Sequence, residues 1–263
     1  MLFTQLIKAN LQTEVLGREI DYYVRLESTN TEAVELMEAG AKEGTLVVTD
    51  NQTAGRGRHD QSWFSGPGKG LAFSVILRPG IGGRSAGLIS LMGALAVADA
   101  VEKFQLAPQV KWPNDILLSG KKCGGVLVET KFKGDIMSTA VMGIGINVNE
   151  TEAEFPEELR PTTTSILMAK ESPAQRELAL AWTLNSLEQW YERLKAGDRS
   201  SIIEAWKRRC AHLGKNVSFI WKREATSGVF LDVSQGGEAI IRRLTDSHHM
   251  TLSSEEISLI REA

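Results

Sequence analysis

The chain has 263 residues, of which 42% are hydrophobic and 24% are charged, and its formal net charge is −3. A chain of this length and composition forms one large globular domain, or a large and a small one. The negative balance argues against a DNA-binding protein, which would carry a basic excess, and no apolar run approaches the roughly 20 residues of a membrane span. We therefore expect a soluble protein that binds neither DNA nor a membrane.

The N-terminus and the cysteines indicate a cytoplasmic protein. The segment MLFTQLIKAN lacks the charged, apolar and small-residue order of a secretory signal. Two cysteines, Cys123 and Cys210, cannot form a disulfide framework, and neither has a cysteine or histidine at metal-ligand spacing. We expect both to be small buried or half-buried residues, and we predict no metal site built by the protein alone.

The first hundred residues predict extended segments that alternate with helices. After the extended segment IDYYVRL (20–26), a helix starts within ESTNTEAVELMEAG (27–40), where Thr29 and Glu32 have capping-box spacing. Strands follow at TLVVTDNQ (45–52) and GLAFSVILRP (70–79). The apolar residues of SAGLISLMGALAVADAVEKF (85–104) recur at helical spacing, which predicts a helix in the core.

The middle of the chain predicts an antiparallel meander. Three strand-like runs are joined by Gly, Lys and Asp turns: QVKWPND (109–115), ILLSGKKCGGVLVETKF (116–132) and KGDIMSTAVMGIGINVN (133–149). Ser172 and Pro173 then have N-cap and first-turn character for a helix that Gly197 ends, and SSIIEAWKRRCAHLG (200–214) predicts another helix.

The last 50 residues favour a small β-barrel. They contain short strand-like runs with the turn SQGG (234–237): NVSFIW, ATSGVFLDV, EAIIRRL, SHHMTL and EISLI. We place a domain boundary near 213–215, which gives a larger domain of residues 1–213 and a β domain of residues 214–263.

The segment QTAGRGRHDQSW (52–63), here called the arginine loop, has the composition of an anion-binding loop. Glycines at 55 and 57 allow backbone N–H groups to approach an anion, and Arg56 and Arg58 present flat, permanently charged forks that match phosphate or carboxylate oxygens. A solvated basic turn explains the tetrapeptide GRGR equally well. The loop matches neither the phosphate-loop pattern nor the dinucleotide-binding turn.

Two further motifs add weight to a ligand site. In KWPND (111–115), Pro113 stiffens the backbone beside Trp112, which makes Lys111 a positioned charge. In GIGIN (143–147), two strand glycines leave one face bare, as happens where a ligand lies against the backbone. A surface lysine beside a packed tryptophan and a tightly packed strand are the alternatives.

Taken in order, five motifs resemble the biotin protein ligases: STN (28–30), QTAGRGR (52–58), KWPND (111–115), KKCGGVLVE (121–129) and GIGINVN (143–149). The resemblance covers about residues 15 to 165, and the β tail is more loosely similar to the family's C-terminal SH3-like domain. It implies an α+β fold of the class II synthetase and biotin ligase type. In this fold a mixed, largely antiparallel sheet is flanked by helices and followed by a small SH3-like β-barrel.

The resemblance also implies an activity in two steps. Biotin and MgATP would give biotinyl-5'-AMP and pyrophosphate, and a lysine of a biotin carboxyl carrier protein domain, as in acetyl-CoA carboxylase, would then take the biotinyl group. The Mg²⁺ would arrive with ATP. Family likeness further favours a homodimer and docking of the carrier beside a sheet edge.

Family roles transfer to the positions that match. Ser28, Thr29, Asn30 and Gln52 would line the biotin pocket; Arg56, Gly57 and Arg58 would cover the adenylate; and Lys111 would contact carboxyl and phosphate oxygens. Gly125 would pack beside biotin, and Asn147 would face the nucleotide. For STN, a helix cap with no ligand is the alternative.

The residues themselves support the chemistry that the resemblance implies. A carboxylate that attacks a phosphate brings like charges together, which costs roughly 4 kcal/mol for a unit pair at about 4 Å and an effective dielectric near 20. Fixed cations offset that cost, and Lys111, Arg56 and Arg58 are the candidates. A glycine-hinged loop would also shield a labile acyl phosphate from water.

The arginine loop departs from the family pattern in one place. Many members carry a second glycine-arginine pair where this chain has Asp60 and Gln61. The loss of one cation beside the phosphates predicts an active enzyme with looser or differently ordered closure.

Three other functions remain open. The first is a lipoate-type ligase of the same fold, and the second is a biotin-binding protein without turnover. The third is a DNA-binding repressor, which in this family uses an N-terminal helix-turn-helix. Because the ligase-like region starts within about 20 residues of Met1, direct operator binding is not expected.

Overall fold

The computed structural model describes residues 1–59 and 61–262. Its helices are α1 (Thr4–Asn10), α2 (Thr29–Glu38), α3 (Ala86–Glu102), α4 (Ile166–Lys170), α5 (Arg176–Lys195) and α6 (Arg199–Arg209), with 3-10 turns η1 (Gly83–Ser85) and η2 (Glu152–Glu154). Its strands are β1 (Ile20–Tyr23), β2 (Leu46–Thr49), β3 (Leu71–Leu77), β4 (Ile81–Gly82), β5 (Gln109–Lys111), β6 (Asp115–Leu118), β7 (Lys121–Lys133), β8 (Ile136–Ile146), β9 (Asn216–Trp221), β10 (Glu224–Val233), β11 (Ala239–Arg243), β12 (His249–Leu252) and β13 (Ile257–Glu262).

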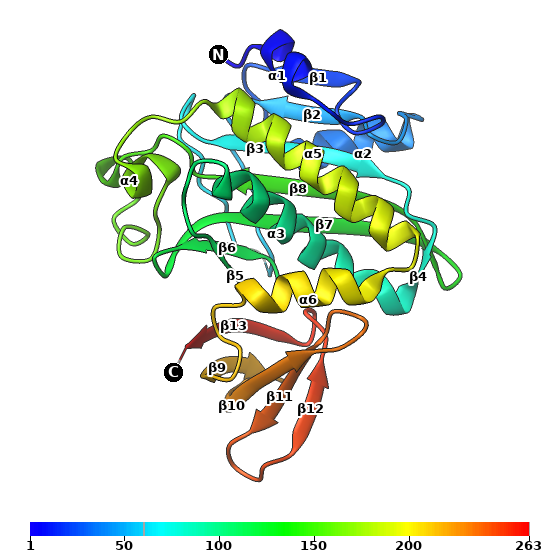
Figure 1. Cartoon of the computed structure of the whole chain (residues 1–263), viewed down its shortest axis with the longest axis vertical. Helices are drawn as coiled ribbons and strands as arrows, with labels where there is room; N and C mark the ends of the chain where they lie inside the picture. The colour runs from blue at the N-terminus through cyan, green and yellow to red at the C-terminus, as the bar shows by residue number, and fades with distance from the viewer. Residues whose placement is uncertain (60, 263) are drawn as a thin grey trace.

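The strands form two sheets. The larger has the order β1-β2-β3-β8-β7-β6-β5, with β4 beside β8; β1 and β2 are parallel and the other neighbours antiparallel. The smaller is an antiparallel curled sheet of order β12-β11-β10-β9-β13, which lies at one end of the molecule (Figure 1). The predicted α+β class, with a mixed, largely antiparallel sheet and a C-terminal SH3-like unit, is confirmed.

The meander predicted in the middle of the chain is confirmed, with one strand more than expected. The run 116–132 divides into β6 and β7 at a hairpin turn. Ser119 and Gly120 form this turn with φ of 49° and 77°, the positive values that a type I′ turn requires at both central positions.

The predicted start of α2 was wrong in detail. Ser28, not Thr29, is the N-cap, and its hydroxyl accepts a hydrogen bond from the backbone of Thr31 at 3.5 Å. Glu32 does not close a capping box, because its carboxylate accepts a hydrogen bond from the Tyr23 hydroxyl at 2.8 Å. Ser28 therefore caps the helix, and it also lines the cavity described below.

The predicted start of α5 was also wrong. The helix begins at Arg176, three residues beyond Pro173. The side chain of Asn149 holds the backbone of Ala174 on both sides, accepting from its N–H at 2.9 Å and donating to its carbonyl at 2.8 Å. These bonds hold the chain outside the helix until Gln175. The short helix α4 was not predicted.

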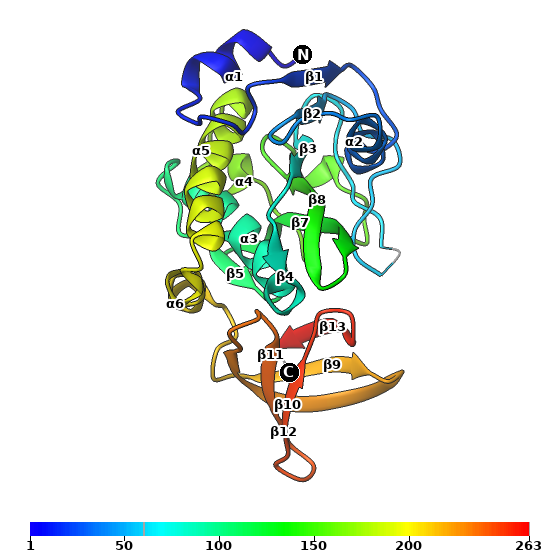
Figure 2. The same ribbon diagram turned by 90° about the vertical axis from the view of Figure 1, so that its right-hand side faces the viewer.

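Helix α3 is the centre of the core. With η1 it forms the stretch Gly83–Glu102, which is long and apolar enough by composition to cross a membrane, contrary to the expectation that no apolar run approaches that length, but 72% of its apolar window is buried inside the protein. Helices α3, α5 and α6 cover one face of the larger sheet, and α2 covers the other (Figure 2). The stretch is therefore a core helix.

Aromatic side chains join the second sheet to the first unit. The Phe230 ring of β10 lies 4.3 Å from the His212 ring and 6.4 Å from that of Trp206, between ring centroids. Trp112 donates its indole N–H to the Gly237 carbonyl at 3.0 Å. Burial lowers the pKa of His212 to about 3, so it is neutral in this apolar seam. The domain boundary near 213–215 stays a prediction.

Candidate active site

One cavity of about 380 Å³ lies where the larger sheet, the start of α2, the arginine loop and strand β13 meet. Nine of the ten candidate residues from the sequence line it: Ser28, Thr29, Asn30, Gln52, Arg56, Gly57, Arg58, Lys111 and Gly125. The five motifs, spread over more than 100 residues of chain, thus converge on a single space.

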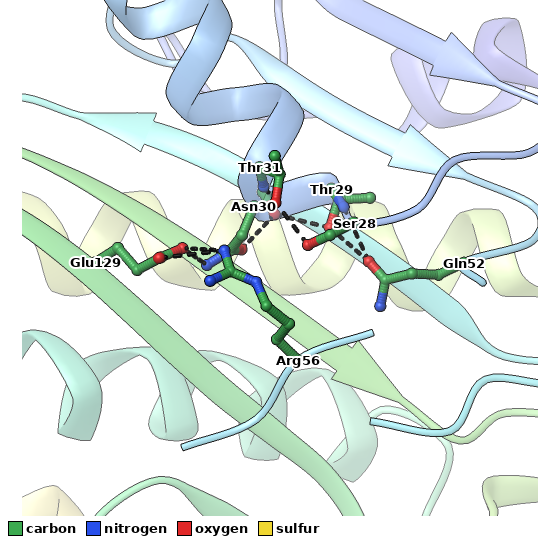
Figure 3. Close-up of polar contacts among 8 residues, drawn as sticks. Ser28, Thr29, Asn30, Thr31, Gln52, Arg56 and Glu129 are labelled. Carbon is green, nitrogen blue, oxygen red and sulfur yellow. Dashed lines mark hydrogen bonds and ion pairs between the residues drawn. The ribbon is translucent and has the colours of Figure 1, made fainter. Parts of the chain in front are cut away.

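The first turn of α2 supplies the polar wall of the cavity (Figure 3). Gln52 accepts hydrogen bonds from the backbone N–H of Thr29 at 2.9 Å and from its hydroxyl at 3.2 Å. Ser74, on β3, donates to the side-chain oxygen of Asn30 at 2.6 Å. Asn30 donates in turn to Glu129 at 2.8 Å. These bonds fix donors and acceptors that can bind a buried polar ring.

Arg56 reaches across to β7. Its guanidinium lies 3.0 Å and 3.1 Å from the two carboxylate oxygens of Glu129, beside Asn30 (Figure 3). The sequence did not mark Glu129 as a site residue, although it ends the motif KKCGGVLVE. Arg56 is therefore paired with a carboxylate of the cavity wall's own strand, β7.

Arg58 contacts the second sheet. Its guanidinium donates to the Ser254 carbonyl and lies 3.3 Å from the Glu255 carboxylate, in the turn between β12 and β13. Burial lowers the pKa of Arg58, and the attraction of Glu255 offsets part of that effect. Of the two residues that depart from the family pattern, Gln61 lines the cavity, while Asp60 lies outside the described residues.

Lys111 stands in a group of charges at the start of the β5–β6 turn. Its Nζ lies 3.8 Å from Asp115 Oδ2, while Lys122 Nζ lies 2.6 Å from Asp115 Oδ1. Burial lowers the pKa of Lys111; Asp115 raises it in part, and the charges of Lys122 and Arg261 lower it further. Lys111 and Lys122 share the single carboxylate of Asp115, so one of their two positive charges remains to attract an anionic ligand.

Sequence reasoning missed Lys122, Asp115 and Arg261, all of which line the cavity. Lys122 stands three residues before Gly125 and Asp115 ends KWPND, so both lay within motifs already noticed. Arg261 comes from β13, about 150 residues further along the chain, and no local pattern marks it.

The strand glycines 143 and 145 accept neighbouring side chains closely. A Cβ at Gly143 would lie 1.9 Å from Asn30 Oδ1, and one at Gly145 would lie 2.3 Å from the Trp63 ring. Their bare faces are therefore required at the cavity wall. The indole nitrogen of Trp63 is buried and has no hydrogen-bond partner among the described residues.

Asn147 does not line the cavity. Its amide is buried and donates to the Thr164 carbonyl at 2.9 Å, and its backbone N–H donates to the Cys123 carbonyl at 2.8 Å. Asn147 therefore supports the strand end next to the site.

Both cysteines are free, Cys123 buried and Cys210 half-buried, as the sequence predicted.

This geometry combines a polar pocket with convergent cations on a sheet flanked by helices, which suits a ligand that has both a polar ring and an anionic group. The biotin/lipoate A/B protein ligase family model matches residues 22–147. The biotin--[acetyl-CoA-carboxylase] ligase of Paracoccus denitrificans is 30% identical over 83% of this chain and 92% of that protein. The chain belongs to the biotin protein ligases within this family.

Two further comparisons agree. The bifunctional ligase/repressor BirA of Bacillus subtilis is 37% identical over 80% of this chain, and the match spans only 65% of that protein's length. The biotin protein ligase of Aquifex aeolicus in complex with biotin and ATP has a TM-score of 0.79 and 28% identity, covering 94% of this chain and 100% of that one. The architecture of both units thus matches a solved ligase.

Proposed function

We propose that this chain is an ATP-dependent biotin protein ligase that attaches biotin to a lysine of a biotin carboxyl carrier protein domain. The observation that carries the proposal is the convergence of STN, the arginine loop and Lys111 on one cavity. The names of the relatives and the biotin and ATP complex of the Aquifex aeolicus enzyme support the same reaction.

In the first step, a carboxylate oxygen of biotin attacks the α-phosphorus of ATP, and the bond to the pyrophosphate breaks. The polar wall of Ser28, Thr29, Asn30 and Gln52 would hold the ureido ring. Lys111 and its neighbour Lys122 would stand beside the joining carboxylate and phosphate, where they offset the mutual repulsion of the two anions.

Mg²⁺ would arrive with ATP and neutralise the departing pyrophosphate. Among the described residues, no group of three or more His, Cys, Asp or Glu side chains could hold a metal ion. The carboxylate of Asp115 is already paired with both lysines of the cavity, Lys111 and Lys122. These pairings fit a metal carried by the nucleotide better than a resident ion.

In the second step, the neutral amine of the carrier lysine attacks the biotinyl carbonyl carbon, AMP leaves, and the amine gives its proton to solvent. Arg56 and Arg58 would cover the phosphate until the carrier arrives, which limits hydrolysis of the mixed anhydride.

We further propose that the enzyme is cytoplasmic, that it binds no DNA and that it forms a homodimer.

Incubation with MgATP, labelled biotin and a carrier domain tests the proposal. Labelled carrier and released pyrophosphate are expected. Labelling with lipoate in place of biotin would instead identify a lipoate-type ligase. Biotin binding without pyrophosphate release would identify a protein that only binds biotin, and retention of operator DNA would add a repressor role.

A further inference from the structure

Both ends of the segment that carries the arginine loop are held at one buried place. Asp50 directly follows β2, the strand that leads into the loop, and its carbonyl accepts a hydrogen bond from the Gly68 N–H at 2.9 Å. Arg176, the first residue of α5, lies 3.0 Å from Asp50 Oδ1 and donates to the Gly70 carbonyl at 3.3 Å. One guanidinium therefore contacts the start and the end of the segment 50–70.

The Asp50–Arg176 pair is withdrawn from water. The side chain of Arg176 is 8% exposed and that of Asp50 is 10% exposed. Asp50 Oδ1 has no aligned hydrogen-bond donor in the described chain, so its attraction to Arg176 is electrostatic. A buried ion pair is often no more stabilising than an apolar replacement, so its presence calls for a reason beyond stability.

Neighbouring groups complete the carboxylate. The Tyr22 hydroxyl and, at 3.1 Å, the backbone N–H of Leu2 donate to Asp50 Oδ2. Burial raises the pKa of Asp50, but the hydrogen bond from Tyr22 and then the charge of Arg176 outweigh it, so the pKa lies below its ordinary value. The carboxyl is therefore ionised at neutral pH, and the pair is permanently charged.

The ion pairs in the middle of the segment are more exposed. Arg56 is paired with Glu129, whose side chain is 35% exposed, and Arg58 with Glu255, whose side chain is 83% exposed. Solvent-exposed ion pairs of this kind contribute little. Arg58 is itself 16% exposed and also donates to the Ser254 carbonyl, but neither pair is as deeply buried as the Asp50–Arg176 pair at the ends of the segment.

We propose that Asp50 and Arg176 are positioning residues for the proposed ligase reaction, a buried clamp that fixes where the arginine loop lies beside the cavity. The clamp touches no substrate. Between its two attachment points lie Gln52, Arg56, Arg58 and Trp63, all of which line the cavity. The inference rests on the proposed function for its catalytic meaning, although the clamp itself is a property of the folded chain.

The decisive variant is Arg176→Gln, which removes the charge and leaves too short a side chain to contact both ends. We expect the share of biotinyl-AMP that escapes per turnover to rise about tenfold and carrier labelling to fall about tenfold to a hundredfold, because misplaced groups lose catalytic geometry. Arg176→Lys keeps the charge but presents a single ammonium. Its escape of biotinyl-AMP and its carrier labelling should lie between those of wild type and those of Arg176→Gln.

Trypsin gives a second readout that does not depend on activity. Cleavage after Arg56 and Arg58 should be about tenfold faster in Arg176→Gln, while cleavage after Lys222 and Arg223 in the β9–β10 hairpin should be unchanged. The matched control is Arg209→Gln, which breaks another partly buried ion pair, Arg209 Nη2 to Asp99 Oδ1 at 2.8 Å, between α6 and α3.

Equal escape of biotinyl-AMP and equal tryptic cleavage in Arg176→Gln and Arg209→Gln would overturn the clamp. A wild-type protein that labels no carrier would refute the proposed function instead, and the tryptic comparison would still decide the clamp. If Arg176→Gln does not fold, Arg176→Lys carries both measurements against wild type.

Discussion

Arg56 of the arginine loop and Glu129 of β7 form an ion pair at the cavity wall, with Arg56 Nη2 3.0 Å from Glu129 Oε2. A phosphate that binds Arg56 must compete with this carboxylate. The ion pair therefore holds Arg56 in place and lowers the affinity of this arginine for an anion.

Glu129→Gln tests that competition. The variant keeps an oxygen that can accept from Asn30 but removes the negative charge facing Arg56. We expect the Kd for biotinyl-AMP to fall about 1.4-fold to fivefold, in line with the roughly 0.2–1 kcal/mol of a partly exposed pair. Calorimetric titration with a non-hydrolysable analogue measures it. Glu255→Gln is the control, since Arg58 keeps the Ser254 carbonyl, and an unchanged Kd in Glu129→Gln would contradict the idea.

Lys122→Ala and Lys121→Ala form a matched pair, because the two lysines are adjacent on β7 and only Lys122 lines the cavity. We expect Lys122→Ala, like Lys111→Ala, to slow pyrophosphate release about a hundredfold to a thousandfold, the effect of removing one preorganised charge. Lys121→Ala should match wild type. Similar rates in both alanine variants at 121 and 122 would show that the charge at 122 is not used.

Gly143→Ala places a methyl group where the Asn30 side-chain oxygen lies, at 1.9 Å. Asn30 must move, so biotin affinity should fall at least about tenfold, and the free energy of unfolding should fall by about 1–3 kcal/mol, as in other overpacked sites. Gly82→Ala is the control, because nothing lies within 4 Å of its added Cβ. Biotin binding that survives in Gly143→Ala would remove Asn30 from the pocket.

Glu150 predicts a pH dependence of stability. It is fully buried, and burial raises the pKa of its carboxyl from 4.5 to about 7. The folded state therefore binds the proton more tightly than the unfolded state, so this group favours folding most below pH 4.5 and loses about 3 kcal/mol of that contribution as pH rises to 7.

Glu150→Gln removes that loss. The variant should exceed wild type in free energy of unfolding by about 3 kcal/mol near pH 8 and by little near pH 4.5. Urea unfolding of both proteins across this range gives the difference. A difference independent of pH would mean that the carboxyl titrates normally in the folded chain.

Local patterns predicted the site better than its surroundings. Residues 52–58 and 111–115 each carry their chemistry in a few adjacent letters, and strand-to-loop order alone brings them to the sheet. The place of Arg261 in the cavity wall and the contact of Arg58 with the Ser254 carbonyl could not be predicted, because they depend on how the second sheet packs, and that is decided by contacts such as Trp112 with Gly237.

The helix starts show the same limit. Pro173 has good first-turn character, yet Asn149, 25 residues earlier, takes both backbone groups of Ala174 and delays the helix. Similarly, Ser28 and not Thr29 caps α2. Thr29 is hydrogen-bonded to Gln52, and Glu32 accepts a hydrogen bond from Tyr23. Local propensity identifies the residues that could start a helix, and hydrogen bonds to residues distant in the sequence decide which of them does.

The hydrogen bond from the Trp112 indole to the Gly237 carbonyl limits whether the C-terminal unit can be replaced by that of another protein. Trp112 is the residue after Lys111, and its buried ring also packs 6.5 Å from that of Phe230, between centroids. A chimaera carrying another protein's C-terminal unit would need a carbonyl and an aromatic ring at the same two points. Without them, the Trp112 ring next to Lys111 would be open to water, so the two units could be exchanged only together.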